Sequence, residues 1–312
     1  MVWLRALLTT VLAIVATPAL PQPAPGQVKM GFLLTSLSRI NPADGSFDFS
    51  AFAWTIDPGK TLDPATQIQV LARRAGIEAI QQAPLADGST FTGLRIEATV
   101  DQTFDLRDFP FDRQTLRVNV EAEVPAERLR FVADEQDSRL ADYLVTQGWN
   151  VTGLRFEERV INYDTKFGVW TTPNFSRLTL LVDIERQRSA LVIEKFIGYT
   201  MALLVTALIF LVPTDQIGVR IGMATTAVFA AVGNRYGLDT LIGAETVFGL
   251  VEQLSLIVFI AIFAAIAATL LTYELAQNRT LALSNRVNIA AGGIVVALSF
   301  ALAGIAILNA RG

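Results

Sequence analysis

The sequence has 312 residues, a mean hydropathy of +0.44 and 52% hydrophobic residues, which is too apolar for an ordinary soluble enzyme. The absence of cysteine excludes disulfides, thiolate metal sites and cysteine nucleophiles, and the absence of histidine removes the commonest general base and transition-metal ligand. A net charge of −4 argues against nucleic-acid binding, because phosphate neutralisation needs a basic surface. We therefore expect a membrane protein that binds or transports, without cofactor or metal.

The first 24 residues have the pattern of a secretory signal peptide. Arg5 supplies a positive charge, residues 6–16 are mostly apolar, and the small residues at 17–19 offer a cleavage site. The alternative is a signal anchor, which we disfavour because eleven residues are too few to span a bilayer. Export and cleavage would place the following chain outside the cytoplasm.

Residues 28–190 hold most of the charge and predict β-structure. The runs Thr115–Val124 and Arg177–Ile184 alternate or carry β-branched residues, as half-buried strands do. Turn signals such as Asn41–Gly45 separate these runs. Several short strands divided by turns indicate an antiparallel, Ig-like β-sandwich. The stretch Pro64–Gln82 is expected to be a short helix or an irregular loop.

Residues 191–312 are expected to form a transmembrane domain. Three apolar segments, at about 193–212, 250–272 and 288–308, match the roughly 20 residues that a spanning helix needs. A fourth segment, 217–238, is too polar to face lipid, so as a span it should face protein or water. The prediction is a β + α membrane protein in which a β-sandwich precedes a four-helix transmembrane bundle.

The charges between the spans predict the orientation. The loops expected on the inside hold Arg220, Arg279 and Arg286, whereas the loop between the second and third spans is acidic. This positive-inside bias places the β-sandwich in the periplasm or outside the cell.

One loop carries the most informative motif. Phe104–Gln114 contains the core Phe109–Asp112, in which a proline between two aromatic residues predicts a tight turn. This core resembles the signature loop of the pentameric ligand-gated ion channels, the Cys-loop receptor superfamily. Gln102 and Leu116 stand where animal members have the bracketing cysteines, as in bacterial members that lack that disulfide.

Other segments extend the resemblance over about residues 28–308. Trp54 and Asp57 resemble positions in the second strand of the family, and Val212–Asp215 resembles the junction between its first two membrane helices. Arg186 matches the arginine that ends the last strand before the membrane. Membership implies a homopentamer in a bacterial inner membrane, whose outer domain senses a ligand while inorganic ions cross an axial pore.

The resemblance also implies which residues couple the outer domain to the pore: Phe109, Pro110, Phe111, Asp112 and Arg186. Because Arg186 ends its strand where little water reaches, an unpaired guanidinium would be costly. We therefore expect a carboxylate partner, either Asp112 or, as a second candidate, Asp44. The alternative is that Arg186 anchors to lipid headgroups.

The polar segment 217–238 is the candidate pore helix. Steps of three and four residues place one stripe along it, which the resemblance implies lines the channel: Gly222, Thr226, Phe229, Gly233 and Tyr236. A ring of Phe229 side chains would expel water and act as a gate. The alternative is a helix-packing face, because glycine and threonine also mediate helix contacts in membranes.

The sign of the permeating ion stays open. Asp215 and Asp239 favour cations, whereas Arg220 favours anions.

The expected ligand site departs from the family pattern. Glu121 and Glu123 lie near the strand that would carry an aromatic residue, and Trp170 and Phe175 lie in the hairpin that should cap the site. We take these four as candidate ligand-binding residues. Anchoring of a surface loop is the alternative for Trp170 and Phe175.

The ligand itself is either a small molecule or the proton. Without histidine, proton sensing would depend on carboxylates such as Asp112, Glu121, Glu123 or Asp134, which titrate at acidic pH. A second function is a non-conducting membrane receptor or scaffold that binds a ligand or partner through its outer domain. An enzyme is not expected, because no nucleophile–base pair or metal cluster is evident.

Overall fold

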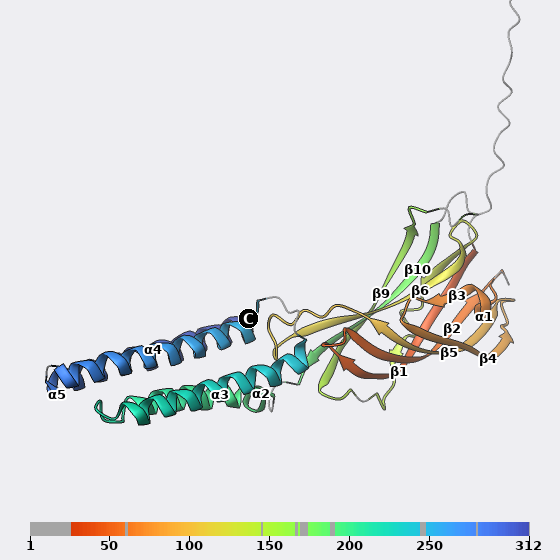
Figure 1. Cartoon of the computed structure of the whole chain (residues 1–312). Helices are drawn as coiled ribbons and strands as arrows, with labels where there is room; N and C mark the ends of the chain where they lie inside the picture. The colour runs from red at the N-terminus through yellow and green to blue at the C-terminus, as the bar shows by residue number, and fades with distance from the viewer. Residues whose placement is uncertain are drawn as a thin grey trace, which may run out of the picture.

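The computed structural model describes residues 26–59, 62–144, 146–165, 168, 174–187, 191–243, 248–278 and 280–311. A β-rich part is followed by a bundle of long helices that extends from one of its ends (Figure 1). The predicted signal peptide lies outside the described residues.

Ten strands form two sheets, and one short helix, α1 (Pro64–Gln67), lies between β2 and β3. The six-stranded sheet follows the order β4 (Arg74–Pro84), β5 (Thr90–Asp101), β2 (Ser46–Asp57), β1 (Gly26–Asn41) and β7 (Leu129–Ala133), with β8 (Arg139–Leu140) also paired to β1. The four-stranded sheet follows the order β3 (Ile68–Val70), β6 (Arg113–Pro125), β10 (Asn174–Arg186) and β9 (Trp149–Asn162).

The sequence predicted an antiparallel sandwich, but the sheets are not wholly antiparallel. β1 pairs in parallel with β7 and with β8, while the other pairings are antiparallel. Parallel pairing requires a crossover connection, and here most of the chain between β1 and β7 supplies it. Local alternation in a strand cannot reveal which distant strand it will pair with.

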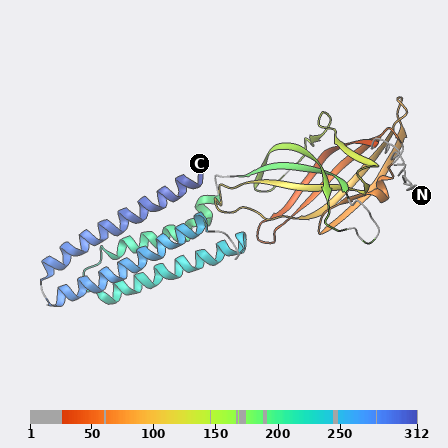
Figure 2. The ribbon, with the colours of Figure 1, turned by 90° about the horizontal axis from the view of Figure 1, so that it is seen from above.

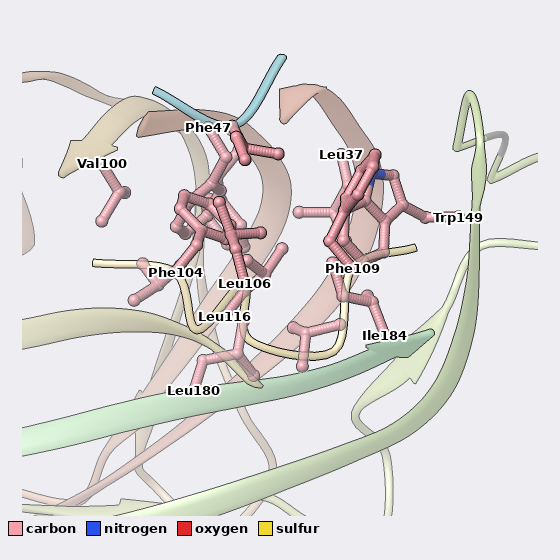
Figure 3. Close-up of a cluster of buried hydrophobic side chains, with 14 of the residues drawn as sticks. Leu37, Phe47, Val100, Phe104, Leu106, Phe109, Leu116, Trp149, Leu180 and Ile184 are labelled. Carbon is pink, nitrogen blue, oxygen red and sulfur yellow. The ribbon is translucent and has the colours of Figure 1, made fainter. Parts of the chain in front are cut away.

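Apolar side chains from both sheets form one buried cluster. β2 alternates buried and half-buried residues along its whole length, as a strand with one face on a core does. At the end of the β-rich part nearest the helices, the cluster is joined by Phe104, Leu106 and Phe109 of the loop 104–114, which we call the signature loop after the motif that it resembles (Figure 3). These side chains of the loop are therefore part of the core and do not lie on its surface.

Four long helices follow: α2 (Leu191–Ile209), α3 (Ile217–Ile242), α4 (Leu250–Asn278) and α5 (Leu281–Arg311). Each overlaps one predicted span, although α5 begins seven residues before the predicted start at 288. They run side by side: α3 packs on α2 and α4, α2 also packs on α4, and α5 packs mainly on α4 (Figure 2). Among the described residues, α3, α4 and α5 are long and apolar enough to cross a membrane, which indicates a multi-pass membrane protein.

An ion pair between a buried carboxylate and a partly exposed lysine ties the first strand to the loop after β7. The Asp134 side chain is 1% exposed, and its carboxylate lies 2.8 Å from Lys29 Nζ and accepts a hydrogen bond from Trp54 Nε1 at 3.0 Å. Burial alone would raise the pKa of Asp134, but these partners outweigh it and hold the pKa below its usual range. The ionised carboxylate therefore stabilises the fold above about pH 4, and that contribution is lost as the pH falls through the lowered pKa.

We expect Asp134→Asn to lower the free energy of unfolding at pH 7 by about 1–3 kcal/mol, because Lys29 loses its partner. The difference from the unmodified protein should shrink as the pH falls below about 4. This difference in the free energy of unfolding is measured by chemical unfolding of the full chain in detergent, monitored by the circular dichroism signal of the sheets. Asp137→Asn, in the same loop but exposed, is the control; equal losses in the two variants would contradict the role of Asp134.

Candidate functional site

The signature loop and the last strand meet through one ion pair. Arg186 Nε donates to Asp112 Oδ1 at 2.8 Å, and Arg186 Nη2 donates to Asp112 Oδ2 at 3.1 Å. The Arg186 backbone N–H also donates to the Asp112 carbonyl at 3.3 Å, and Gln114 Nε2 donates to Asp112 Oδ2 at 3.1 Å. The two-point geometry, with side chains 1% and 12% exposed, is that of a partly desolvated Arg–carboxylate pair.

Two aromatic rings hold the guanidinium in place. Arg186 Cζ lies 4.1 Å from the centre of the Trp149 ring and 4.9 Å from the centre of the Phe109 ring. Phe109 and Trp149 lie next to each other at one end of the buried cluster (Figure 3). Sequence reasoning missed Trp149, which stands directly opposite Arg186 in the β9–β10 pairing; only the register of that hairpin reveals it.

The structure answers which carboxylate meets Arg186. It is Asp112, as expected, and not Asp44, whose carboxylate accepts from Arg73 Nη1 at 3.0 Å. The hydrogen bond from Ser46 and the charge of Arg73 hold the pKa of Asp44 below its usual range. Arg186 is thus engaged by a carboxylate and two rings, which leaves little of it to reach lipid headgroups.

The same end of the β-rich part touches three of the helices. Leu250 N, at the start of α4, donates to the Arg107 carbonyl at 2.7 Å, and a Cβ on Gly249 would lie only 2.5 Å from that oxygen. Arg311 Cζ, at the end of α5, lies 5.0 Å from the centre of the Phe111 ring. The turn after β1 approaches the end of α3, where a Cβ on Gly243 would lie 3.5 Å from Ala43 Cα.

A cavity of about 920 Å³ lies inside this junction. Its walls are the turn at 42–45, the segment 101–107, which includes the start of the signature loop, and residues 242–243 at the end of α3. The loops therefore touch the helices at separate points with space between them.

The predicted stripe on α3 faces away from the rest of the chain. Phe229 and Tyr236 are 72% and 70% exposed, and Thr226 is exposed with its hydroxyl donating to the Gly222 carbonyl at 3.1 Å. A Cβ on Gly222 or Gly233 would meet no atom within 4 Å. The opposite face of α3 is buried against the rest of the chain. Its buried residues are Arg220, Ala224, Ala227, Ala231, Leu238 and Ile242.

Arg220, counted above among the charges of the inner loops, lies at the start of the segment 217–238 and is part of the helix. It is in the first turn of α3, and its side chain is fully buried among the four helices. Arg220 Nε donates to the Ile209 carbonyl at 3.1 Å, Nη1 donates to Thr272 Oγ1 at 2.9 Å, and Nη2 donates to Asn288 Oδ1. The guanidinium thus joins the end of α2 to α3, α4 and α5.

The candidate ligand residues are only partly brought together. The Glu121 carboxylate is buried and accepts from Arg177 Nη2 at 2.7 Å and from Tyr163 Oη at 3.0 Å. Burial and the Glu121 carboxylate raise the pKa of Tyr163. Phe175 is buried edge-on against Tyr163, with ring centres 5.8 Å apart, whereas Glu123 is exposed. Trp170 lies outside the described residues.

The Glu121 carboxylate is therefore occupied by partners from its own chain. The sequence alone did not point to Arg177 or Tyr163, since they reach Glu121 through the pairing of β10 with β6 and with β9. Among the residues that the structure describes, no cluster of histidine, cysteine or acidic side chains could hold a metal ion.

No protein-family model matches the sequence, and no curated protein matches it.

We expect the Arg186–Asp112 pair to show a coupling energy of about 1 kcal/mol or more in a double-mutant cycle. Each single alanine variant leaves a partly buried charge without its partner, so the double variant should be less destabilised than the sum of the two. The free energies of unfolding of the full chain in detergent measure the cycle.

The neighbouring pair Arg113–Glu185 is the matched control. It joins β6 to β10 one residue away from Asp112 and Arg186, but its nitrogen–oxygen distance is 3.7 Å and the arginine is 74% exposed. Its coupling should stay below about 0.5 kcal/mol. Equal coupling in both cycles, or strict additivity at Arg186 and Asp112, would contradict the importance of the buried pair.

Proposed function

We propose that the protein is a subunit of a homopentameric ligand-gated ion channel in a bacterial inner membrane. The β-rich part would be a periplasmic, Ig-like sandwich that senses the ligand, and α3 would line the axial pore. The observation that carries the proposal is the two-faced character of α3: one face is buried on the other helices, and the opposite face is an exposed row that includes Thr226, Phe229 and Tyr236.

The exposed row of α3 differs from the lipid-facing surfaces of its neighbours. Along the middle of α4 and α5 the exposed large side chains are apolar, as Leu256, Phe263 and Ile294 are, and the exposed polar side chains lie near the helix ends. The exposed row of α3 mixes glycine and threonine with two aromatic residues. Polar groups in a membrane segment normally face protein or a water-filled path, and five copies around an axis would turn this row toward a common lumen.

A count of crossings supports α2 as the fourth span. β10 leads almost directly into α2, and the end of α5 returns to the β-rich part, where Arg311 meets Phe111 (Figure 1). Both ends of the helical part thus lie on one side, which requires an even number of crossings. Since α3, α4 and α5 account for three, α2 supplies the fourth, and its 19 residues span roughly 28 Å.

The junction supplies a route for coupling. The Arg186–Asp112 pair fixes the signature loop to the strand that continues into α2, while the same loop region contacts α4 through Arg107 and α5 through Phe111. Movement of the β-rich part on ligand binding would reach the helices through these contacts, and the turn at 42–45 would pass it to the end of α3.

One observation favours the second candidate function, a non-conducting receptor or scaffold. The carboxylate of Glu121, expected to contact ligand, is held by Arg177 and Tyr163. A site closed in this way suits a protein that binds a partner by its outer domain. Single-channel recording of the purified protein in a planar bilayer distinguishes the two functions, because only a channel passes discrete currents.

We expect Phe229→Ala to increase the resting conductance. Removing a ring of aromatic side chains from the middle of the pore lets water persist at the constriction. Phe263→Ala is the matched control, because Phe263 is 67% exposed near the middle of α4 on a surface assigned to lipid. Equal resting conductance in Phe229→Ala and the unmodified protein would contradict the assignment of Phe229 as the gate.

A further inference from the structure

We propose that Glu252 and Arg235 are positioning residues that connect the signature loop to α3 and hold Phe229 in its resting position. The two side chains form an ion pair between the first turn of α4 and the part of α3 nearest the β-rich part. This inference rests on the proposed function, because it concerns the gate of the pore. It adds a connection to α3 through α4, which neither the signature motif nor the stripe of α3 predicts.

The connection begins where the signature loop touches α4. The Leu250 N–H donates to the Arg107 carbonyl at 2.7 Å, and Leu250 is buried. Gly249, which precedes the helix, lies so close to the loop that an added Cβ would be 2.6 Å from Arg107 Cα. Backbone atoms in such close contact cannot turn aside as the end of a flexible side chain can. A displacement of the loop therefore displaces the start of α4.

The Glu252 carboxylate joins the start of α4 to α3. Its Oε2 accepts from the Gly249 N–H at 2.9 Å, and its Oε1 accepts from Arg235 Nη1 at 3.0 Å. The first bond is the one that a glutamate in the third helical position makes back to the residue before the helix. It fixes the carboxylate relative to the helix start, while the second bond fixes the guanidinium of α3 relative to the carboxylate.

The ion pair lies where breaking it would be costly. Glu252 and Arg235 are 19% and 28% exposed, and both belong to helices that are long and apolar enough to cross a membrane. A charge in such a segment normally stays paired, because an unpaired one loses its hydration without compensation. We therefore expect Arg235 to follow Glu252 when the start of α4 shifts.

A second contact holds α3 from the side of α2. The Gly198 N–H donates to Asn234 Oδ1 at 2.9 Å, and an added Cβ on Gly198 would lie 2.6 Å from that oxygen. Because Asn234 and Arg235 are consecutive, α2 and α4 hold α3 at the same level. Phe229 lies about 9 Å further along the helix. Since packed helices shift by roughly 1–2 Å as rigid elements, a shift of Arg235 also moves the Phe229 ring.

The test measures opening without a ligand, through a single introduced thiol. The chain has no cysteine, and an added Cβ on Gly222 or Gly233 would meet no atom of the described residues within 4 Å. Gly222→Cys lies about 10 Å to the inner side of Phe229, and Gly233→Cys lies about 6 Å to its outer side. A membrane-impermeant thiol reagent is added to bacterial cells stripped of their outer membrane. Mass spectrometry of the purified full chain then gives the labelling rate.

Glu252→Gln and Arg235→Gln should each raise the labelling rate of Gly222→Cys by roughly fivefold or more, because each removes a contact of the resting arrangement. Gly249→Ala, which forces the start of α4 away from the loop, should raise this rate as well. It should add nothing in the Glu252→Gln background, where the connection is already broken. The labelling rate of Gly233→Cys, outside the gate, should stay the same in all variants.

Asp239→Asn is the matched control. The Asp239 carboxylate lies 3.0 Å from Arg235 Nε and has an exposure similar to that of Glu252, but it belongs to α3 itself. It therefore cannot transmit a displacement between helices, and the labelling rate of Gly222→Cys should change by less than about twofold. Equal changes in Asp239→Asn and Glu252→Gln would overturn the connection.

The other outcomes separate the connection from the channel function. An unchanged labelling rate of Gly222→Cys in both glutamine variants would overturn the connection and leave the channel function standing, and so would full additivity of Gly249→Ala and Glu252→Gln. No labelling of Gly233→Cys would show that the row on α3 does not face water, which overturns the proposed function and this inference with it. If Glu252→Gln does not reach the membrane, Arg235→Gln and Gly249→Ala form the same cycle.

Discussion

The contact between Arg186 and Asp112 is the constraint on which the junction between the two parts depends. A guanidinium at the end of the last strand, with little access to water, is stable only with a carboxylate and further partners. Asp112 supplies the charge, and the rings of Trp149 and Phe109 lie against the guanidinium. The signature loop is consequently drawn into the core of the β-rich part while its other residues, Arg107 and Phe111, remain beside the helices.

The helical part is organised by a second arginine with different chemistry. Arg220 has no acidic partner among the described residues and instead joins four helices through neutral acceptors. Such a fully buried guanidinium is costly in a membrane interior and normally marks a functional position. It fixes which face of α3 packs inward, and so leaves the row with Phe229 and Tyr236 exposed.

The two arginines lie at opposite ends of the helices and complement each other. Arg186 lies at the end of the helices next to the β-rich part, where the start of α4 and the end of α5 meet it. Arg220 lies at the far end, where α2 is followed by α3. In the proposed channel, the outer end could then move with the sensing domain while the inner end stays fixed, which is the behaviour a gate in the middle of α3 requires.

The sequence alone determined the order of the elements, because strand alternation and long apolar runs are local signals. The positions of the four helices could be predicted from the apolar runs, although α5 begins seven residues before its expected start. The cost of an unpaired charge predicted a carboxylate partner for Arg186, and the family resemblance pointed to Asp112. Only the tertiary structure decided what depends on distant neighbours. The parallel pairing of β1 with β7 and the ring of Trp149 over Arg186 follow from strand register. Likewise, segments far apart in the chain bring Arg177 and Tyr163 to Glu121 and surround Arg220 with neutral acceptors among the described residues. Charge composition is a property of the sequence, but whether a charge is neutralised depends on which side chains the fold places within a few ångströms of it.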